Sequence, residues 1–176
     1  EDLAAVVATE LGKQIVDVQI GQAMAHPGPF SGWQHLMRCM AYHARTGSDS
    51  LRRCTEEARK AVSAAPDLGI AHAVLAAALA GRVSGEGQAL DDALRREIQA
   101  HIARAMQLDG DNPMVIARLV SAYAALEDGE TCLRLARRAV ELNPYWVDAH
   151  HMLGAACLSL GRTAEAILAY TEELDR

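Results

Sequence analysis

Apolar residues recur every three or four positions along most of this chain, a spacing that predicts helices. The first segment shows it clearly, because one side of a helix over residues 2–25 would carry Leu3, Val7, Leu11, Ile15 and Val18. Its other positions are polar: Glu10, Lys13, Gln14, Asp17 and Gln22. We expect this helix to cap the structure that follows. Two alternatives remain open, in which the helix lies in a groove of that structure or pairs with its copy in a dimer.

The rest of the chain predicts helices in pairs. Pro27 and Pro29 interrupt the pattern, and the pairs that follow are expected at 31–46 with 49–64, 68–82 with 89–109, 112–126 with 130–142, and 145–160 with 163–176. Ser31 and Thr163 are the expected N-caps, and Gly161 is the expected helix terminator.

The pairs repeat along the sequence. Leu119 matches Leu153 and Ala105 matches Ala139, both at an offset of 34 residues. Leu75 precedes Leu119 by 44 residues, so ten extra residues lie in the second unit. The glycine-rich stretch 81–87 is where we expect a lengthened turn, and the first unit has its own turn lengthened by about five residues.

This period of two helices resembles the tetratricopeptide repeat (TPR). In the last unit the resemblance is carried by Leu153, Gly154, Cys157, Gly161 and Ala166, with Pro144 closing the unit before it. The first unit matches at Trp33, Leu36, Met40, Cys54, Ala58, Ala61 and Pro66. The resemblance implies an all-α protein, an α-solenoid of about four TPR-like helix pairs in a right-handed superhelix, preceded by one long N-terminal helix. Residues 1–26 would form that helix, and residues 27–176 the repeats 31–66, 67–110 with an insertion near 81–91, 111–144 and 145–176.

A narrower resemblance follows from the order of these segments and from the stretch 67–76, which reads Asp-Leu-Gly-Ile-Ala-His-Ala-Val-Leu-Ala. It looks like the C-terminal repeat region of bacterial class III adenylate cyclases and winged-helix transcriptional regulators. That likeness implies a regulatory or oligomerisation part of a larger bacterial signalling protein, whose effector domain would precede Glu1.

Composition narrows the possible partners. The net charge of −6 and the pI of about 5.6 argue against a nucleic-acid-binding face, and no apolar run is long enough to span a membrane. Cys39, Cys54, Cys132 and Cys157 form no CxxC pair and lie among apolar residues, so we expect four free, buried thiols and a cytoplasmic protein.

The inner wall of such a solenoid comes from the first helix of each pair, and it is the candidate binding surface. The register assigns to this wall Gln34, Arg38, Ala73, Ala77, Met114, Ala117, Ser121, Asp148, His151 and Ala155. The positively charged clamp with which some repeat proteins hold a carboxylate is absent, and an alanine-lined trough suits an apolar helix or an extended segment. We therefore expect a protein or peptide partner. Ile167 and Tyr170, which point away from the last pair, suggest a homodimer as well.

The residues provide no recognisable catalytic or metal-binding motif. Adjacent helical residues such as His150 and His151 point about 100° apart, so they do not converge on one ion. His72 and His150 occupy equivalent slots, where we expect buried, hydrogen-bonded packing. We expect no metal site at His35 and His43, which lie two turns apart on a helix whose stripe is otherwise core. The prediction is a non-catalytic interaction scaffold with no cofactor and no metal. The alternative is a small-ligand sensing or accessory domain of an enzyme such as an adenylate cyclase.

Overall fold

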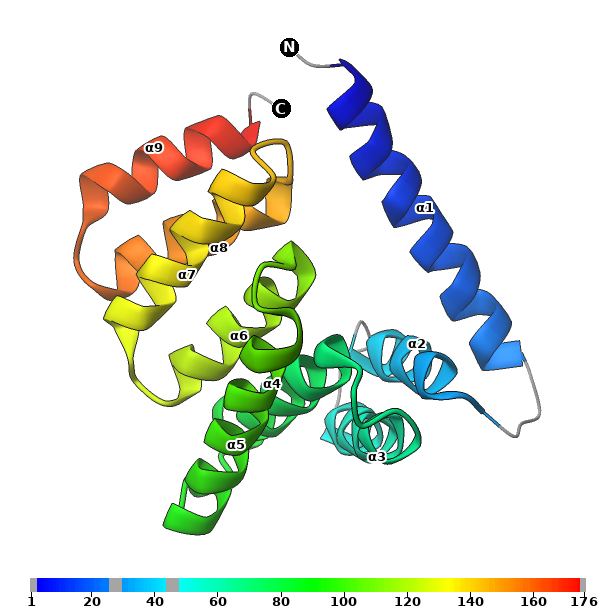
Figure 1. Cartoon of the computed structure of the whole chain (residues 1–176). Coiled ribbons are helices and arrows are strands. Elements are labelled where there is room, and N and C mark those ends of the chain that lie inside the picture. The colour runs from blue at the N-terminus through cyan, green and yellow to red at the C-terminus, as the bar shows by residue number, and fades with distance from the viewer. Residues whose placement is uncertain (1–2, 26–29, 44–47, 175–176) are drawn as a thin grey trace.

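The computed structural model describes residues 3–25, 30–43 and 48–174, and within them it contains nine helices and no strand. The helices are α1 (Leu3–Ala25), α2 (Gly32–His43), α3 (Ser48–Ala64), α4 (Gly69–Glu86), α5 (Asp92–Asp109), α6 (Pro113–Ala125), α7 (Gly129–Leu142), α8 (Val147–Ser159) and α9 (Thr163–Leu174). Pro27 and Pro29, the predicted break, lie outside the described residues. Figure 1 shows α2 to α9 following one another as a stack, with α1 at its edge.

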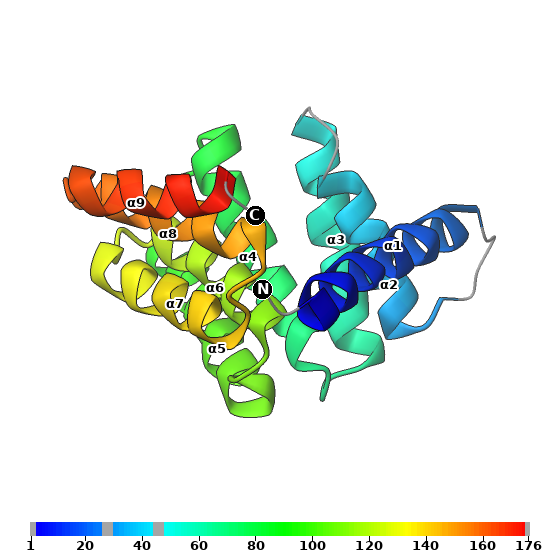
Figure 2. The same ribbon diagram turned by 90° about the horizontal axis from the view of Figure 1, so that it is seen from above.

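The stack is built from helix pairs, so the predicted α-solenoid is confirmed. In each pair an A helix (α2, α4, α6 or α8) packs against the B helix that follows it (α3, α5, α7 or α9). Successive pairs then pack through α3 on α4, α4 on α6, and α7 on α8 (Figure 2). Because each pair contacts only its neighbours, the hydrophobic core runs along the stack.

Small side chains lie where the A and B helices come closest. Ala58, Ala105 and Ala136 on the B helices are fully buried. In the last pair the glycine at position 154 is required, because a Cβ there would lie 2.6 Å from the ring of Tyr170. Alanine and glycine therefore let the helix axes approach to a distance that larger residues would prevent.

The cysteines of these helix contacts show that the expectation of four free thiols was wrong. Cys39 of α2 and Cys54 of α3 are disulfide-bonded, with Cα atoms 4.1 Å apart. The equivalent Cys132 of α7 stays free, and its Sγ donates a hydrogen bond to the Val120 carbonyl oxygen at 3.3 Å. The sequence could not reveal the bond, because it is the close approach of α2 and α3 that brings two distant cysteines together.

The helix ends follow local capping rules in two of three predicted cases. The Ser31 hydroxyl accepts a hydrogen bond from the Gln34 amide, and the Gln34 side chain accepts one from the Ser31 amide, which confirms Ser31 as an N-cap with a capping box. Gly161, with φ of 71°, confirms the predicted end of α8. Thr163 is already the first residue of α9, so it is not the N-cap.

The insertion in the second unit is mainly helical, which corrects the expected long turn. α4 continues through Gly81 to Glu86 and ends at Gly87, whose φ is 66°. In the first unit α2 begins 37 residues before α4, so the extra length is three residues rather than five. Neither glycine at 81 or 85 breaks the helix, and the side chain of Leu51 on α3 lies near both of them.

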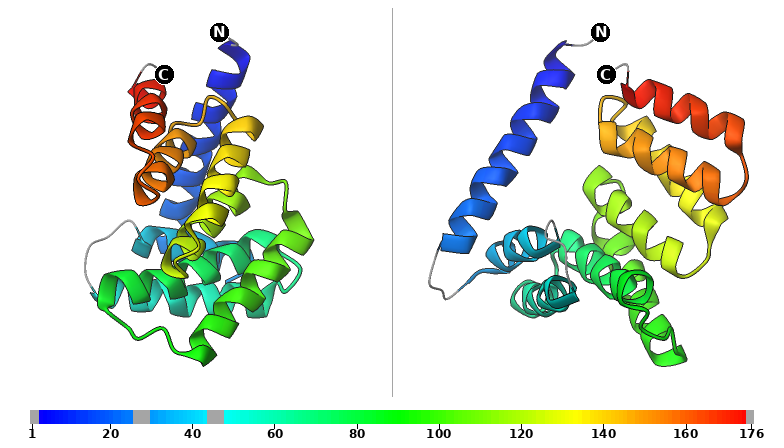
Figure 3. Two further views of the ribbon diagram at one scale, coloured as in Figure 1. Left: turned by 90° about the vertical axis from the view of Figure 1, so that its left-hand side faces the viewer. Right: turned by 180° about the vertical axis from the view of Figure 1, so that it is seen from behind.

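α1 packs with a different side from the one predicted. Ala23 is buried and Val16, Ile20 and Met24 pack against the core, whereas Val7, Leu11, Ile15 and Val18 are exposed. Leu3 is the first residue of α1, but its side chain lies outside the described part of the structure. Figure 3 shows α1 at the edge of the molecule, next to α2 at its C-terminal end. Toward its other end, Asn143, just after α7, donates a long hydrogen bond to Thr9 at 3.5 Å.

Candidate functional site

The predicted wall residues of α6 and α8 lie in register on neighbouring helices. Met114 of α6 corresponds to Asp148 of α8, and Ser121 corresponds to Ala155, each pair 34 residues apart in equivalent helices. All four are exposed, and His151 of α8 is exposed as well. Two further side chains enlarge this surface, since Val147 and Leu158 are exposed by 40% and 50%. We call this surface the A-helix wall; its members are Met114, Ser121, Val147, Asp148, His151, Ala155 and Leu158.

The wall is partly apolar and lightly charged. Leu158 and Val147 are the larger exposed apolar side chains of α8, and Met114 on α6 is exposed by 37%. Asp148 accepts a hydrogen bond from the indole nitrogen of Trp146 at 3.2 Å, and His151 lies against the ring of Tyr170. Such a mixture can bind an apolar segment while a carboxylate and an imidazole fix its orientation.

The predicted wall does not extend over α4. Ala73 is fully buried and Ala77 half-buried, while Ala117 of α6 is 8% exposed. α4 packs against α2, α3, α5 and α6, so few of its positions reach the surface. These alanines pack beneath the surface, so they have little or no exposed area with which to contact a partner.

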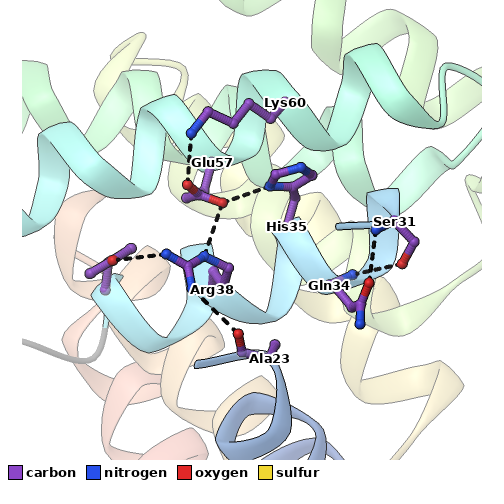
Figure 4. Close-up of polar contacts among 8 residues, drawn as sticks. Ala23, Ser31, Gln34, His35, Arg38, Glu57 and Lys60 are labelled. Carbon is purple, nitrogen blue, oxygen red and sulfur yellow. Dashed lines mark hydrogen bonds and ion pairs between the residues drawn. The ribbon is translucent and has the colours of Figure 1, made fainter. Parts of the chain in front are cut away.

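The two predicted wall residues of α2 are engaged in holding the structure together. Gln34 forms the capping box with Ser31. The guanidinium of Arg38 lies 3.3 Å from the Glu57 carboxylate and donates to the Ala23 carbonyl oxygen at 3.4 Å (Figure 4). It also lies over the Phe30 ring. Arg38 therefore links α1 to α2 and α3 instead of offering its charge to a partner.

Two residues of α2 with a better claim to the wall were missed. The three-residue insertion makes Trp33 equivalent to Met114 and Met40 equivalent to Ser121. Trp33 is 41% exposed, although its indole nitrogen donates to Gln19 of α1 at 2.8 Å. The sequence contains the signal, because both are large apolar residues, but an assumed insertion of five residues hid their register.

Glu57 is the centre of a buried polar cluster beneath this end of the stack. Its carboxylate bonds His35 Nδ1 at 2.7 Å and Lys60 Nζ at 3.0 Å. Burial acts to raise the pKa of Glu57, but the hydrogen bonds from His35 and Lys60 outweigh it, and the pKa is lowered. The carboxylate thus stays charged, and the cluster acts as a clamp between α2 and α3.

Histidines recur at one position of the A helices, and the expectation of buried packing is confirmed for His72 and His150. His72 Nε2 donates to the Pro66 carbonyl oxygen at 2.9 Å, and His150 Nε2 donates to that of Pro144 at 2.8 Å. The third repeat has Ile116 at this position, after a turn in which Gly110 replaces the proline. The histidine therefore serves to bind the carbonyl of a proline-containing turn.

The partners of these histidines differ between repeats. His72 Nδ1 lies 2.9 Å from Nδ1 of His101 on α5. Because a carbonyl can only accept, His72 carries its proton on Nε2, so the neutral pair has His101 donating from Nδ1. Burial, and then the neighbouring His72, lower the pKa of His101. His150 Nδ1 instead faces the Glu172 carboxylate at 3.3 Å.

An arginine-lined hollow of about 680 Å³ between α5, α6 and α7 was not predicted at all. Arg134, Arg137, Arg138 and Arg162 line it, together with the carboxylates of Asp111, Glu130 and Glu141. Most of these cations have partners, since Arg137 pairs with Glu165 at 2.6 Å and Arg162 with Glu130 at 3.1 Å. The spacing of the three α7 arginines puts them on one helix face, which the sequence shows but which alone indicates only a solvated face.

Burial raises the pKa of the Cys132 thiol to about 11, which keeps it protonated. No group of three His, Cys, Asp or Glu side chains among the described residues could hold a metal ion. No helix within the described ranges is long and apolar enough to cross a bilayer.

Comparison with known proteins identifies the architecture. The chain is similar to TTC0263, a thermophilic TPR protein of Thermus thermophilus, with a TM-score of 0.69, 16% identity, and 98% of this chain and 87% of that chain covered. The paired helices of the present chain are those of a TPR fold. Two crystal structures of MamA are also similar, with TM-scores of 0.55 and 0.54 and 15% identity; the first covers 91% of this chain and 85% of MamA, the second 82% and 72%.

Sequence comparison adds nothing to this result, because no family profile and no curated protein matches the chain. At 15–16% identity, the structural similarity establishes the TPR fold and no more.

Proposed function

We propose that this chain is a non-catalytic protein-interaction module whose A-helix wall binds an apolar peptide segment of a partner. The observation that carries the proposal is the exposed apolar surface of Met114, Val147 and Leu158, which lies in register along α6 and α8 with Asp148 and His151 beside it. TPR folds serve generally as interaction scaffolds, which supports the same role.

Selection from a library of random peptides displayed on phage tests this proposal directly. We expect the selected peptides to share apolar residues at helical or alternate spacing and to bind with micromolar affinity. Leu158→Glu should weaken binding by at least tenfold, because it places a charge in the apolar part of the wall. Leu168→Glu is the matched control, since Leu168 is 66% exposed on α9 outside the wall. Equal binding by both variants would disprove the assignment of the wall.

A second candidate function is the binding of a small anionic ligand in the arginine-lined hollow. Its volume of about 680 Å³ is within the range of small-molecule sites. Thermal-shift measurements with phosphate, nucleotides and dicarboxylates would reveal it, and Arg134→Ala should abolish the shift. Arg96→Ala on α5 is the control, because Arg96 is exposed and does not line the hollow. Absence of any saturable shift would remove this candidate.

We also infer a regulatory or oligomerising role within a larger bacterial signalling protein. The support is the sequence likeness of residues 67–76, and of the segments around them, to the repeat regions of adenylate cyclases and winged-helix regulators. A cytoplasmic location fits that role, although the Cys39–Cys54 disulfide removes two of the four free thiols on which the expectation was based.

A further inference from the structure

The exposed stripe of α1 is the most extensive apolar feature without a partner on the described part of the chain. Its residues Val7, Leu11, Ile15 and Val18 are between 45% and 59% exposed. Together they present roughly 350 Å² of apolar surface, comparable with the largest patch on a typical monomer. Single exposed apolar residues are ordinary, but a stripe along several turns of one helix is an interaction surface.

α1 has little to stabilise it within its own chain. It packs against α2 through Val16, Ile20, Ala23 and Met24, all in its C-terminal half. The glycines at positions 12 and 21 have open space around them, so nothing nearby requires a glycine there, and each weakens the helix. A helix rich in valine and isoleucine, held mainly at one end, is only marginally stable in water. Covering its stripe would supply the missing stabilisation.

The charges of α1 leave the stripe free to face an identical helix. Because a helix turns 100° per residue, Glu10, Lys13 and Asp17 lie more than a quarter turn from the centre of the stripe. The positions that border the stripe are all uncharged: Ala8, Gln14, Gln19 and Gly21. The stripe itself carries no charge, so two copies can bring their stripes together without burying a charged group, even though each chain has a net charge of −6.

We propose that the occupant of the stripe is α1 of a second copy, paired antiparallel about a two-fold axis near residue 13. In that register Leu11 faces Ile15 of the other copy and Ala8 faces Val18, so small residues oppose large ones at the ends of the contact. Antiparallel pairing also aligns the two helix dipoles favourably. The two stripes would bury roughly 700 Å² of apolar surface between them, which is the scale of a weak, transient interface. A weak, reversible dimer is expected from so small a contact, and it does not depend on the function proposed for the wall.

Sedimentation velocity of the intact chain at concentrations from the low micromolar range to about a hundred micromolar tests the dimer. We expect a concentration-dependent dimer for the unmodified chain. Leu11→Glu and Ile15→Lys should each be monomeric over this range, whereas Lys13→Glu, a matched charge change on the other side of α1, should still dimerise. The stripe is exposed in the protomer, so circular dichroism should show that all three variants remain folded.

Mixing the two stripe variants tests the geometry. Antiparallel pairing sets the new carboxylate of the Leu11→Glu chain opposite the new ammonium group of the Ile15→Lys chain, so the equimolar mixture should recover a heterodimer. Three results would each overturn the proposal: an unmodified chain that is monomeric at the highest concentration, dimers that survive Leu11→Glu, or a mixture that stays monomeric. Dissociation by Leu158→Glu or Leu168→Glu would also overturn it, because the interface would then include the A-helix wall or α9.

Discussion

At the scale of single residues, two equivalent turns place a glutamate and a glycine in the same backbone conformation. α6 and α8 both end in a turn whose residue lies in the left-handed region, with φ of 61° at Glu127 and 71° at Gly161. In each, the next amide bonds back to the helix, from Asp128 to Tyr123 and from Arg162 to Cys157. Glycine adopts this conformation without steric cost, whereas in glutamate the Cβ atom makes the same conformation unfavourable.

Glu127→Gly should therefore stabilise the protein by about 1 kcal/mol and raise the melting temperature by roughly 3 °C. Thermal unfolding followed by circular dichroism measures the change. Gly161→Ala is the reciprocal control and should be destabilising, because it puts a Cβ into the same conformation. A loss of stability in Glu127→Gly would contradict the steric account.

His101 predicts how stability depends on pH. Burial and the adjacent His72 lower its pKa in the folded protein, while Glu97 partly offsets and Arg59 slightly reinforces that shift. Below the ordinary histidine value of about 6.5, the unfolded chain takes up a proton that the folded chain resists. The stability contribution is thus present above that pH and is lost as the pH falls through it.

We expect the free energy of unfolding in urea to decrease as the pH falls from about 7.5 to about 5.5, across the ordinary histidine value. His101→Gln keeps a donor for His72 without titrating, so its decrease over this range should be smaller. Parallel pH profiles for the two proteins would count against the assignment to His101.

At the scale of elements, the attachment of α1 to the first helix pair depends strongly on the side chain of Arg38. Arg38 connects the Ala23 carbonyl, the Tyr42 hydroxyl and the Glu57 carboxylate, and thereby ties the end of α1 to the first pair. Its side chain is 18% exposed and Glu57 is 8% exposed, so water screens their interaction less than it would at the surface.

Arg38→Met keeps the apolar stem but removes these bonds, and we expect a loss of about 1–3 kcal/mol. Hydrogen exchange followed by mass spectrometry should show that the substitution speeds exchange in α1 more than in α4 or α6. Arg52→Met is the control, since Arg52 pairs with Asp49 and Glu56 at the surface and should change stability by less than about 0.5 kcal/mol. Equal effects of the two substitutions would show that Arg38 has no special role.

At the scale of the whole molecule, the solenoid presents three separate surfaces. The A-helix wall, the arginine-lined hollow and the stripe of α1 are built from different side chains, so a partner, a small anion and a second copy would not compete for the same residues. α1 packs against the first repeat through α2 (Figure 1), and its Thr9 accepts one long hydrogen bond from Asn143 after α7.

The helical repeat was predictable because its signals are local. Spacing of apolar residues, the capping box at Ser31 and the glycine at 161 act within a few residues, and the match of Leu119 with Leu153 reports one packing unit used again. The same reasoning identified exposed positions of α6 and α8 at Met114, Ser121 and Ala155. Regular spacing sufficed there because no insertion separates those two units.

Other features depended on contacts between distant residues. Whether the stripe of α1 is covered, whether Arg38 faces a partner or Glu57, and whether Cys39 meets Cys54 are each decided by how the helices are placed. Sequence by itself determined that the chain forms helix pairs that must stack, since neither helix of a pair can bury its apolar face alone. Only the tertiary structure decided which faces remain outside the stack, because α1 has two apolar sides and its periodicity cannot rank them.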